Sequence, residues 1–408
     1  MEFGPIFRAV TRHRARFVLI VAEVALTLAL VANCVNLILD ARAELARRSG
    51  FDEENLVVVN AEPFEEAFRD DAYRNRVMDA DAAALRAMPG VKAVSQTNLA
   101  PWGRSASATG VQVEGKNEME PMGTQFYIGD HGLLDALGAE LVEGRAFTRE
   151  EYETPNEEGS TAPFNIIVSR SLADALFPEG GALGKKLQFP GGESSIMTIV
   201  GIIDRFYKPF RGEDFQTRVM LAPGRTGNYE YGTTFLVRTE PGQLDAVRAD
   251  LEATLLRVDK GRNVRLDTIP ELRQRAQARN RMLVATLNGV MGLLLLVTAL
   301  GIVGLTSFSV AERRRQIGTR RALGATKADV LRYFLLENWL VTTCGAVLGI
   351  GLAIGLNIGL VNLVEGSRVG WPVLGAGVVL LWVVGLAAAL GPALRAAQVP
   401  PAIATRNV

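Results

Sequence analysis

Residues 282–310 read MLVATLNGVMGLLLLVTALGIVGLTSFSV and contain no charged side chain. A helix of this length can cross the hydrocarbon layer of a bilayer, which is about 30 Å thick, at roughly 1.5 Å per residue. The core helices of soluble proteins seldom run so far without a charge. The stretch therefore predicts a transmembrane helix.

Three further segments, at 17–39, 333–363 and 371–394, are also long and apolar enough to span a bilayer. The first could instead be a cleaved signal peptide. It is longer than a usual signal core, however, contains Glu23 and lacks a small-residue cleavage site. The charged residues 40–281 follow it. The sequence predicts an α-helical membrane protein with four transmembrane helices and a large α/β domain inserted between the first two.

Basic residues in the short connecting segments predict the orientation, because short loops rich in Lys and Arg stay in the cytoplasm. The loop 311–332 is strongly basic, whereas the loop between the third and fourth spans contributes Arg368. Both termini, 1–16 and 395–408, are then cytoplasmic, and the domain at 40–281 is periplasmic in a bacterial inner membrane. The basic residues on the cytoplasmic side are Arg8, Arg12, Arg14, Arg16, Arg313, Arg314, Arg315, Arg320, Arg321, Lys327, Arg395 and Arg406.

The overall composition argues against nucleic acid as a partner and against disulfides or metal sites formed by cysteine. Basic and acidic residues are equal in number, 44 of each, so the chain lacks the net positive charge that nucleic acid requires. The two cysteines, Cys34 and Cys344, fall inside predicted spans. They are interpreted as small apolar packing residues rather than as a disulfide or metal ligands. The outer domain must therefore fold on its own apolar core.

The outer domain begins and ends with a β-α-β pattern. The first has strands at 55–60 and 91–96 around a helix at 65–88, and the second has strands at 233–239 and 263–269 around a helix at 243–258. These patterns predict an α/β core formed by 51–99 and 231–270, with an inserted subdomain at 100–230. The insertion is expected to contain strands at 110–114, 125–128, 165–168, 186–189, 196–203 and 219–222, and short helices at 132–137 and 171–176.

Helical stalks are expected to join this domain to the membrane. The helix of the first span continues outward and ends near Gly50, because glycine terminates helices well. Thr268 and Glu271 form a capping-box pattern, so a helix begins there and runs into the second span. The charged stretches 40–48 and 271–281 are interpreted as solvated parts of the stalk without chemistry of their own.

Catalytic motifs are missing from the sequence. Its two histidines, His13 and His131, belong to neither an H-E-x-x-H motif nor a G-x-S-x-G nucleophile elbow. The segment GGALGKK at 180–186 is not a phosphate-binding loop, because Glu179 stands where the first Gly is needed and Lys186 where Ser or Thr is needed. We expect no enzyme activity, metal or cofactor on this chain, so any ATPase would lie on a partner subunit.

The basic loop is also predicted to contain a short helix, followed by the start of a new one. Thr326 and Asp329 form a capping-box pattern, so a new helix begins between them. Before it, residues 317–324 are expected to form a short cationic, partly apolar helix, with Gly318 and Gly324 permitting tight turns at its ends. Such a helix at the membrane surface suits docking by another protein. The alternative is that the arginines only fix topology.

The run ERRRQIGTRRALGATKADVLRYFLLEN, residues 312–338, closely resembles the signature of MacB/FtsX-type ABC transporter permeases. The end GPALRAAQVPPAIATR, at 391–406, resembles the family's closing pattern, and segments 137–147 and 199–206 resemble its periplasmic domain. One departure is Gln316, where the family usually has Glu. The resemblance covers nearly the whole chain. It assigns the ATPase-coupling loop to Glu312, Arg313, Arg315, Ile317, Gly318, Arg321, Ala322, Leu323 and Gly324.

The resemblance implies a permease that forms a dimer with an identical or related chain and works with a cytosolic ABC ATPase that binds ATP and Mg²⁺. ATP hydrolysis would move the periplasmic domain and drive export or extraction of a substrate by mechanotransmission. A membrane-fusion protein and an outer-membrane channel remain open as partners. The alternative is an FtsX-like scaffold that activates periplasmic cell-wall hydrolases without transport. Because about sixteen residues precede the first span, we expect no fused ATPase.

Two features inside the predicted spans are candidates for function. The intramembrane carboxylates Glu23 and Glu337 are costly to place there, which favours a functional role. For Glu23, the alternative is a position near enough to the interface to stay hydrated. Glycines recur along the third span and allow another helix to approach closely, either within one subunit or across a dimer. These glycines are Gly345, Gly349, Gly351, Gly355 and Gly359.

The missing phosphate-binding loop predicts that the purified chain does not hydrolyse ATP. We expect phosphate release at the level of a protein-free control, measured on the chain after removal of any co-purifying subunit. Sustained turnover by the pure chain would contradict this prediction.

Overall fold

The computed structural model describes residues 14–103, 107–116, 120–153, 163–190, 196–208, 213–364 and 367–400. The chain divides into two compact units. One, called the outer unit, is Arg47–Ala278, and the other, called the membrane unit, contains the residues up to Ala46 and from Arg279 onward. Arg8, Arg12, His13 and Arg406 lie outside the described residues.

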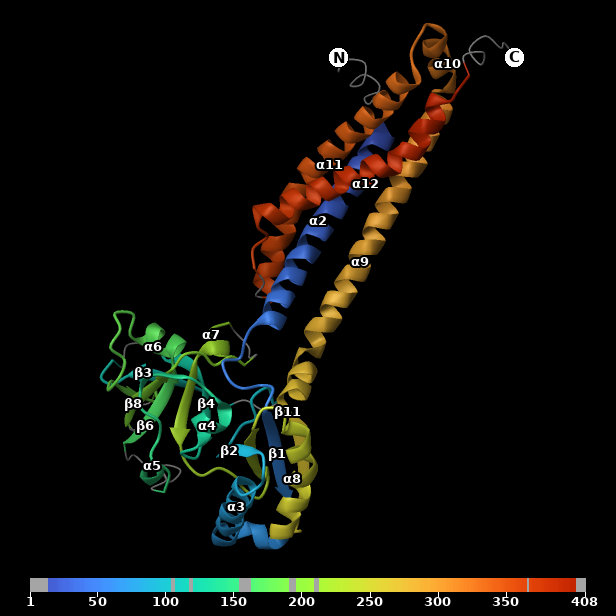
Figure 1. The fold of residues 1–408 in the computed structure, drawn as a ribbon. Helices are drawn as coiled ribbons and strands as arrows, with labels where there is room; N and C mark the ends of the chain where they lie inside the picture. Colours follow the sequence, from blue (N-terminus) through green and yellow to red (C-terminus); the bar gives the residue numbers. More distant parts are fainter. Residues whose placement is uncertain are drawn as a thin grey trace. The chain divides into compact units, whose positions relative to one another are not determined.

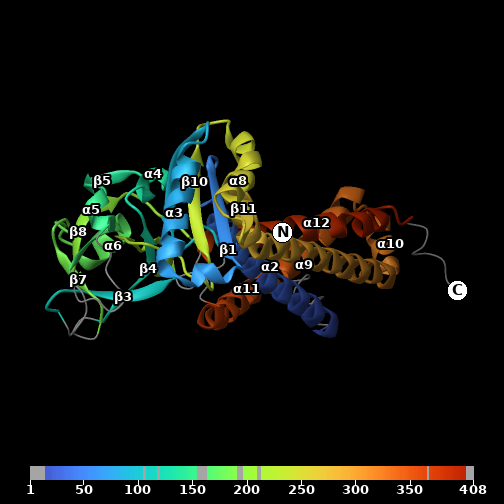
Figure 2. The same ribbon diagram turned by 90° about the horizontal axis from the view of Figure 1, so that it is seen from below.

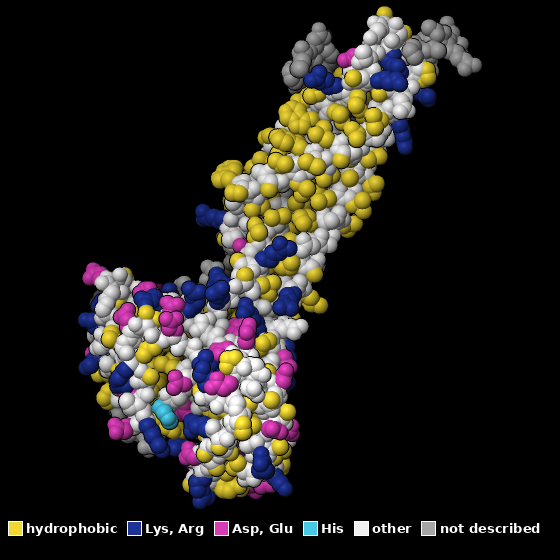
Figure 3. All heavy atoms as spheres, viewed as in Figure 1, with side chains coloured by type: hydrophobic (Ala, Val, Ile, Leu, Met, Phe, Trp, Pro, Cys, Tyr) yellow, Lys and Arg dark blue, Asp and Glu magenta, His cyan; other side chains and the backbone are white. Residues whose placement is uncertain are grey.

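The membrane unit is built on four long helices: α2 (Arg14–Ala46), α9 (Ile269–Glu312), α11 (Lys327–Val364) and α12 (Trp371–Ala397). Each contains an apolar segment long enough to cross a membrane, so the prediction of four spans is confirmed. Hydrophobic side chains cover the visible face of these helices (Figure 3). A short helix, α10 (Arg314–Ala322), lies between α9 and α11 (Figure 1).

Helices α2, α11 and α12 pack closely through apolar side chains, several of which are alanines. Val24 and Leu28 of α2 share a buried cluster with Ala346 of α11 and Leu381 of α12. A second cluster joins alanines of α2 and α11 to α12 in the same way. Such close approach of helices needs residues without bulky side chains at the crossing points.

Helix α9 contacts this bundle at a few points. The hydroxyl groups of Thr27 and Thr298 form a hydrogen bond of 2.8 Å. The carboxylate of Glu23 lies against Gly301, where an added Cβ would stand 2.5 Å from both carboxylate oxygens. Leu295 of α9 also packs against the cluster that contains Val24 and Leu28, so this contact has a polar and an apolar part, and it leaves no room for a side chain at Gly301.

The outer unit contains one eleven-stranded sheet in the described residues. At one end the strand order is β11 (Arg262–Thr268), β1 (Leu56–Pro63), β10 (Thr233–Thr239) and β2 (Val91–Thr97), and neighbouring strands are antiparallel. The two expected β-α-β units are present and interlock, because β10 lies between β1 and β2 while β1 lies between β10 and β11. Helices α3 (Asp71–Arg86) and α8 (Leu244–Val258) cover one face (Figure 2).

The expectation of one helix over 65–88 is wrong in detail. A short 3₁₀ turn, η1 (Glu66–Arg69), precedes α3. Asp70 between them is extended, and its carboxylate accepts a hydrogen bond of 2.6 Å from the backbone N–H of Tyr73. Asp favours this capping position over a helix interior, which explains the break.

The insertion between β2 and β10 extends the same sheet. Its strands are β3 (Ala108–Val113), β4 (Met122–Gly129), β5 (Leu141–Gly144), β6 (Phe164–Ser169), β7 (Lys186–Gln188), β8 (Ile196–Ile203) and β9 (Val219–Pro223). Its helices are α4 (Leu133–Leu137), α5 (Arg149–Glu153), α6 (Arg170–Leu176) and α7 (Glu213–Thr217). The sequence did not predict β5, α5 or α7, because each is too short to show a periodic pattern.

A buried ion pair ties α3 to the edge of the sheet. The guanidinium of Arg262 binds both carboxylate oxygens of Asp81, and neither side chain is more than 2% exposed. Burial raises the pKa of the Asp81 carboxyl, and the hydrogen bonds from Arg262 work in the opposite direction. The same guanidinium also donates to the backbone carbonyl of Leu255 on α8, at 2.7 Å. The pair therefore links both covering helices to β11.

The chain enters the outer unit through a tight turn at Gly50. Helix α2 ends at Ala46, and Gly50 has a φ of +86°. A Cβ at this position would lie 2.0 Å from the backbone oxygen of Arg205. No side chain fits here, either by backbone conformation or by space.

We predict that Gly50→Ala destabilises the outer unit by on the order of 3 kcal/mol or more, since backbone strain and a steric clash add. Gly242 is the matched control, with a φ of +80° and no atom near an added Cβ. Gly242→Ala should cost about 1 kcal/mol. Denaturant unfolding of a fragment covering residues 47–278, which we expect to fold alone, measures both. Equal losses would show that the contact with Arg205 has no effect.

Candidate coupling site

The loop after α9 folds into a defined short helix. Helix α10 (Arg314–Ala322) is followed by Gly324, with a φ of +102°, and by the capping box that starts α11. The N–H of Thr326 donates to the Asp329 carboxylate at 2.9 Å, and the N–H of Asp329 donates to the Thr326 hydroxyl at 3.2 Å. The expected helix start and the turn at Gly324 are confirmed. Gly318 lies inside α10 and forms no turn, which corrects that expectation.

An apolar contact and an arginine hold α10 against the membrane helices. Ile317 is 5% exposed and packs with Val330, Phe334 and Ala393. The guanidinium of Arg321 donates to the backbone oxygens of Ala397 and Val399, at 3.2 and 2.7 Å. Both side chains therefore fix α10 within this chain. Ile317 is not available as an apolar anchor for a partner.

The carboxylate of Glu337 has a partner in the loop. The guanidinium of Arg313 lies 3.0 Å from it, and both side chains are 16% exposed. Arg313 also donates to the Tyr333 hydroxyl at 3.4 Å, and the Arg320 guanidinium lies 5.2 Å from the centre of that ring. This ion pair joins the junction of α9 and α10 to α11. An uncompensated charge at either position would be costly here.

Other loop residues face outward. Leu323 is 84% exposed, an unusual position for a large apolar side chain. Glu312, Arg315 and Ala322 are also exposed. Of the residues assigned by resemblance, these four and Gly324 form the accessible surface, while Arg313, Ile317 and Arg321 position the loop. The exposed side chain of Gln316 stands where the family usually has Glu.

The first turns of α9, which belong to the outer unit, form ion pairs with α8 and β11. The carboxylate of Glu271 pairs with Arg248 of α8 at 2.9 Å. The guanidinium of Arg275 pairs with Asp267 of β11 at 2.6 Å. The stretch 271–281 is largely exposed, and two of its charged side chains also form ion pairs with α8 and β11. Sequence spacing could not find these pairs, because only the fold places α8 and β11 beside α9.

The glycines of the third span divide into two groups. Gly345 and Gly349 face α2, where an added Cβ would stand 2.7 Å from Val24 and 2.9 Å from the backbone oxygen of Ala25. The other three meet no atom within 4 Å: Gly351, Gly355 and Gly359. Packing within one subunit explains the first group. In the described residues the second group has no neighbour.

Two family profiles match the chain. The MacB-like periplasmic core domain matches residues 18–254, more than half of the chain, and the FtsX-like permease C-terminal domain matches residues 288–401. The chain belongs to the MacB/FtsX-type ABC transporter permeases. The resemblance drawn from residues 312–338 is thereby confirmed. As a permease of this family, the chain is a membrane protein with a periplasmic domain.

Individual relatives agree with this family. The uncharacterized ABC transporter permease YknZ of Bacillus subtilis (strain 168) is 26% identical over 283 residues, which cover 67% of this chain and 68% of YknZ. The macrolide export ATP-binding/permease protein MacB of Brucella abortus (strain 2308) is 27% identical over 289 residues, or 67% of this chain and 42% of that MacB. This permease thus spans less than half the length of the Brucella protein.

Solved periplasmic domains are also similar. The periplasmic region of MacB from Actinobacillus actinomycetemcomitans has a TM-score of 0.36 and 14% identity, covering 55% of this chain and 94% of that one. The extracellular domain of YknZ has a TM-score of 0.34 and 15% identity, covering 52% of this chain and all of that domain.

The ion pair between Arg313 and Glu337 gives a stability prediction. Glu337→Ala should destabilise the permease by about 3 kcal/mol, the low end for a broken buried pair, because the remaining guanidinium keeps some access to water. The double variant Arg313→Met with Glu337→Met should recover most of this loss. The midpoint of unfolding in detergent measures both. A double variant as unstable as the single one would show that the pair itself is not the cause.

Proposed function

We propose that this permease couples ATP hydrolysis by a partner subunit in the cytosol to movement of its periplasmic domain, and so drives export or extraction of a substrate from the periplasm or the membrane. One observation carries the proposal. Helix α9 runs without interruption from Ile269 to Glu312, from the outer unit to the loop that contains α10. An α-helix is stiff along its axis, so a displacement at one end reaches the other.

The contacts at both ends of α9 suit this role. Near Glu312, the Arg313–Glu337 pair and the packing of Ile317 make α10 one body with α11 and α12. Near Ile269, the pairs of Glu271 and Arg275 fix the helix to the sheet and to α8. A force on α10 would therefore move the helix rather than bend a loose connection.

The other connection between the units is not helical. Helix α2 ends at Ala46, and Arg47–Gly50 precede the first strand without helical structure. Of the two connections between the units, α9 is therefore the one along which a movement could pass through continuous helix.

The partners in this proposal follow from the family. An ABC ATPase in the cytosol would bind ATP and Mg²⁺ and dock on the exposed side of α10. A second permease, identical or related, would complete the dimer in the inner membrane, with both termini of each chain in the cytoplasm. MacB from Brucella abortus is named as a macrolide exporter. We propose the same direction of transport for this permease, but not the same substrate.

Docking on α10 is tested with Leu323→Asp. Leu323 is 84% exposed and has no part in holding the loop, so the variant should fold and insert normally. We expect stimulation of the ATPase by the permease to fall at least tenfold, because an interface anchor of this size is worth about 2 kcal/mol or more. Pull-down of the ATPase and its rate of phosphate release are the measurements.

Two comparisons make this experiment decisive. Phe64→Asp changes a residue of the outer unit that is 56% exposed, and it should leave ATPase stimulation unchanged. Arg321→Glu should also abolish coupling, but it breaks the contacts to Ala397 and Val399 as well, so Leu323→Asp is the cleaner change. Association of the ATPase with Leu323→Asp at the level of the unaltered chain would leave the loop as a topological anchor alone.

A further inference from the structure

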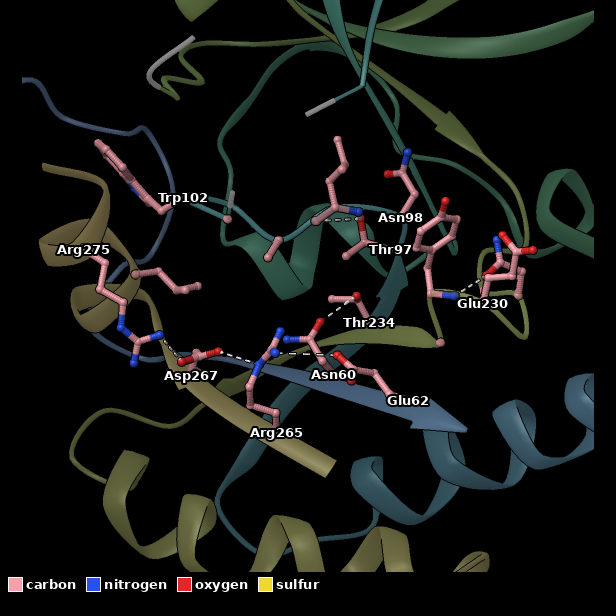
Figure 4. Close-up of a pocket in the computed structure, with 18 of the residues that line it drawn as sticks. Asn60, Glu62, Thr97, Asn98, Trp102, Glu230, Thr234, Arg265, Asp267 and Arg275 are labelled. Carbon is pink, nitrogen blue, oxygen red and sulfur yellow. Dashed lines mark hydrogen bonds and ion pairs between the residues drawn. The ribbon is translucent and has the colours of Figure 1, made fainter. Parts of the chain in front are cut away.

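Two of the hollows in the described residues differ in how their charges are compensated. The larger, of about 1240 Å³, lies in the outer unit, and Figure 4 shows its arginines joined to carboxylates. There Arg265 lies 3.6 Å from Glu62 and 3.4 Å from Asp267, and Arg275 pairs with the same aspartate at 2.6 Å. The smaller, of about 150 Å³, lies in the membrane unit between α10 and α11. It is called the α10–α11 pocket.

The α10–α11 pocket forms where one side of each helix faces the other. Four residues of α10 line it at positions i, i+3, i+4 and i+7, so they share one side of that helix. They are Arg313, Gln316, Ile317 and Arg320. The facing residues of α11 are Asp329, Val330, Tyr333 and Phe334. The apolar members other than Tyr333 are buried, whereas Gln316, Arg320 and Asp329 are exposed, so the accessible surface of the pocket is polar.

Two of the three charges that line the pocket are compensated within the chain. The guanidinium of Arg313 pairs with Glu337 at 3.0 Å. The carboxylate of Asp329 accepts hydrogen bonds from the N–H and the hydroxyl of Thr326, at 2.9 and 2.6 Å. Arg332 stands three residues further along α11, where it can also interact with Asp329. Neither Arg313 nor Asp329 therefore needs a ligand to balance its charge.

Arg320 is the third charge, and the chain does not compensate it. It is exposed and forms no ion pair with a carboxylate in the part of the chain that the structure describes. Its guanidinium lies 5.2 Å from the ring centre of Tyr333, which positions it at the pocket. A guanidinium held in this way can bind a phosphate through two parallel hydrogen bonds. The amide of Gln316 adds a neutral donor one turn away.

The pocket lies at a level where lipid headgroups are expected. Tyr333 is the first residue of the predicted span 333–363, and tyrosines are common at the headgroup level. Leu336, three residues further along the same side of α11, is 37% exposed, so the helix beyond the pocket offers an apolar surface to acyl chains. Leu323, the exposed residue proposed for the ATPase, does not line the pocket. A lipid therefore suits this position better than a segment of the ATPase.

The surroundings of the pocket attract anions. Lys and Arg side chains gather at the α10 end of the membrane unit (Figure 3). The exposed ones near the pocket are Arg314, Arg315, Lys327, Arg332 and Arg395, against the exposed acidic residues Glu312 and Asp329. Basic pockets between membrane helices on the cytoplasmic side are known to bind anionic headgroups.

We propose that the α10–α11 pocket binds the phosphate group of an anionic phospholipid, with Arg320 and Gln316 as donors, and that this lipid holds α10 against α11. Its volume is below the range of about 300–1000 Å³ that is usual for small-molecule sites, which suits a single headgroup. A zwitterionic headgroup would bring an ammonium group among the arginines and fits less well. The inference rests on the proposed function, which places this end in the cytoplasmic leaflet, and it adds a ligand to the coupling site.

Binding is tested on the full chain in detergent micelles that contain equal amounts of phosphatidylglycerol and phosphatidylcholine, without any ATPase. Native mass spectrometry identifies the lipid molecules that each chain retains. We expect phosphatidylglycerol to be retained about fivefold more often or better, which is roughly the effect of one basic residue beside an anionic leaflet. Equal retention of the two lipids would overturn the proposal.

A second arm distinguishes a lipid from free phosphate. Inorganic phosphate is added in excess, and sodium chloride at the same ionic strength is the reference, because salt alone screens charges. Retention of phosphatidylglycerol should be the same in both, since inorganic phosphate has no acyl chain to keep it at the pocket. Displacement of the lipid by inorganic phosphate would assign the pocket to a soluble anion and overturn the proposal.

Three variants locate the site. Gln316→Glu keeps the size of an exposed side chain and places a carboxylate one turn before Arg320, where the two can pair, so retention of phosphatidylglycerol should fall about fivefold or more. Arg320→Gln should lower it to the level of phosphatidylcholine. Arg395→Gln is the matched control, because it removes an exposed arginine outside the pocket, and it should change nothing. An equal loss in Arg395→Gln and Arg320→Gln would overturn the proposal.

The outcome is separable from the test of the coupling site. Leu323→Asp should retain phosphatidylglycerol and lose stimulation of the ATPase, which would support both proposals. A permease that stimulates its ATPase but shows no preference for phosphatidylglycerol would overturn the lipid site and leave the proposed function standing. Loss of the ATPase from Gln316→Glu in a pull-down, with no lipid preference in the unaltered chain, would assign the pocket to an acidic segment of the ATPase instead.

Discussion

The continuity of α9 is the constraint on which the rest of the structure depends. Inside a membrane each backbone N–H and C=O must find its partner within the helix, so the apolar half of α9 cannot be interrupted. The charged half beyond it stays helical because the capping box of Thr268 and Glu271 starts the helix inside the outer unit. A single continuous helix thus belongs to both units.

Ion pairs lie at both ends of α9. Arg275 and Glu271 attach it to the sheet and to α8, and Arg313 attaches the loop after it to Glu337. Within the membrane unit, by contrast, α9 meets α2 through the hydroxyl pair of Thr27 and Thr298 and through Glu23 against Gly301. Leu295 of α9 also packs against the apolar cluster of that bundle.

The same arrangement links the outer unit's cavity to the helix. Leu272 and Arg275 occupy successive turns of α9 and form part of the cavity wall. The sheet face beneath is polar because the apolar core covers only its other half, through Leu56 and Val58.

The sequence alone determined the four spans, the position of the large domain between the first two, the two β-α-β units and the helix start at Thr326. These are local properties, because the length of an apolar segment, the alternation along a strand and a capping box each depend on residues close together in the sequence. The family could also be recognised from the sequence, since the motif at 312–338 is contiguous. Short elements such as β5 (Leu141–Gly144) and the break at Asp70 were missed, because a few residues carry too little periodicity.

Only the tertiary structure decided which of these side chains act together. Ile317 reads as an exposed anchor and is buried, because α12 returns beside it from more than seventy residues away in the chain, at Ala393 and Ala396. Arg275 is exposed, as the sequence predicts, but it also pairs with Asp267, because β11 lies beside α9. The cavity is built from five separate stretches of chain, between Asn60 and Ala276. Contacts between residues far apart in sequence depend on how the chain packs, and no local pattern records them.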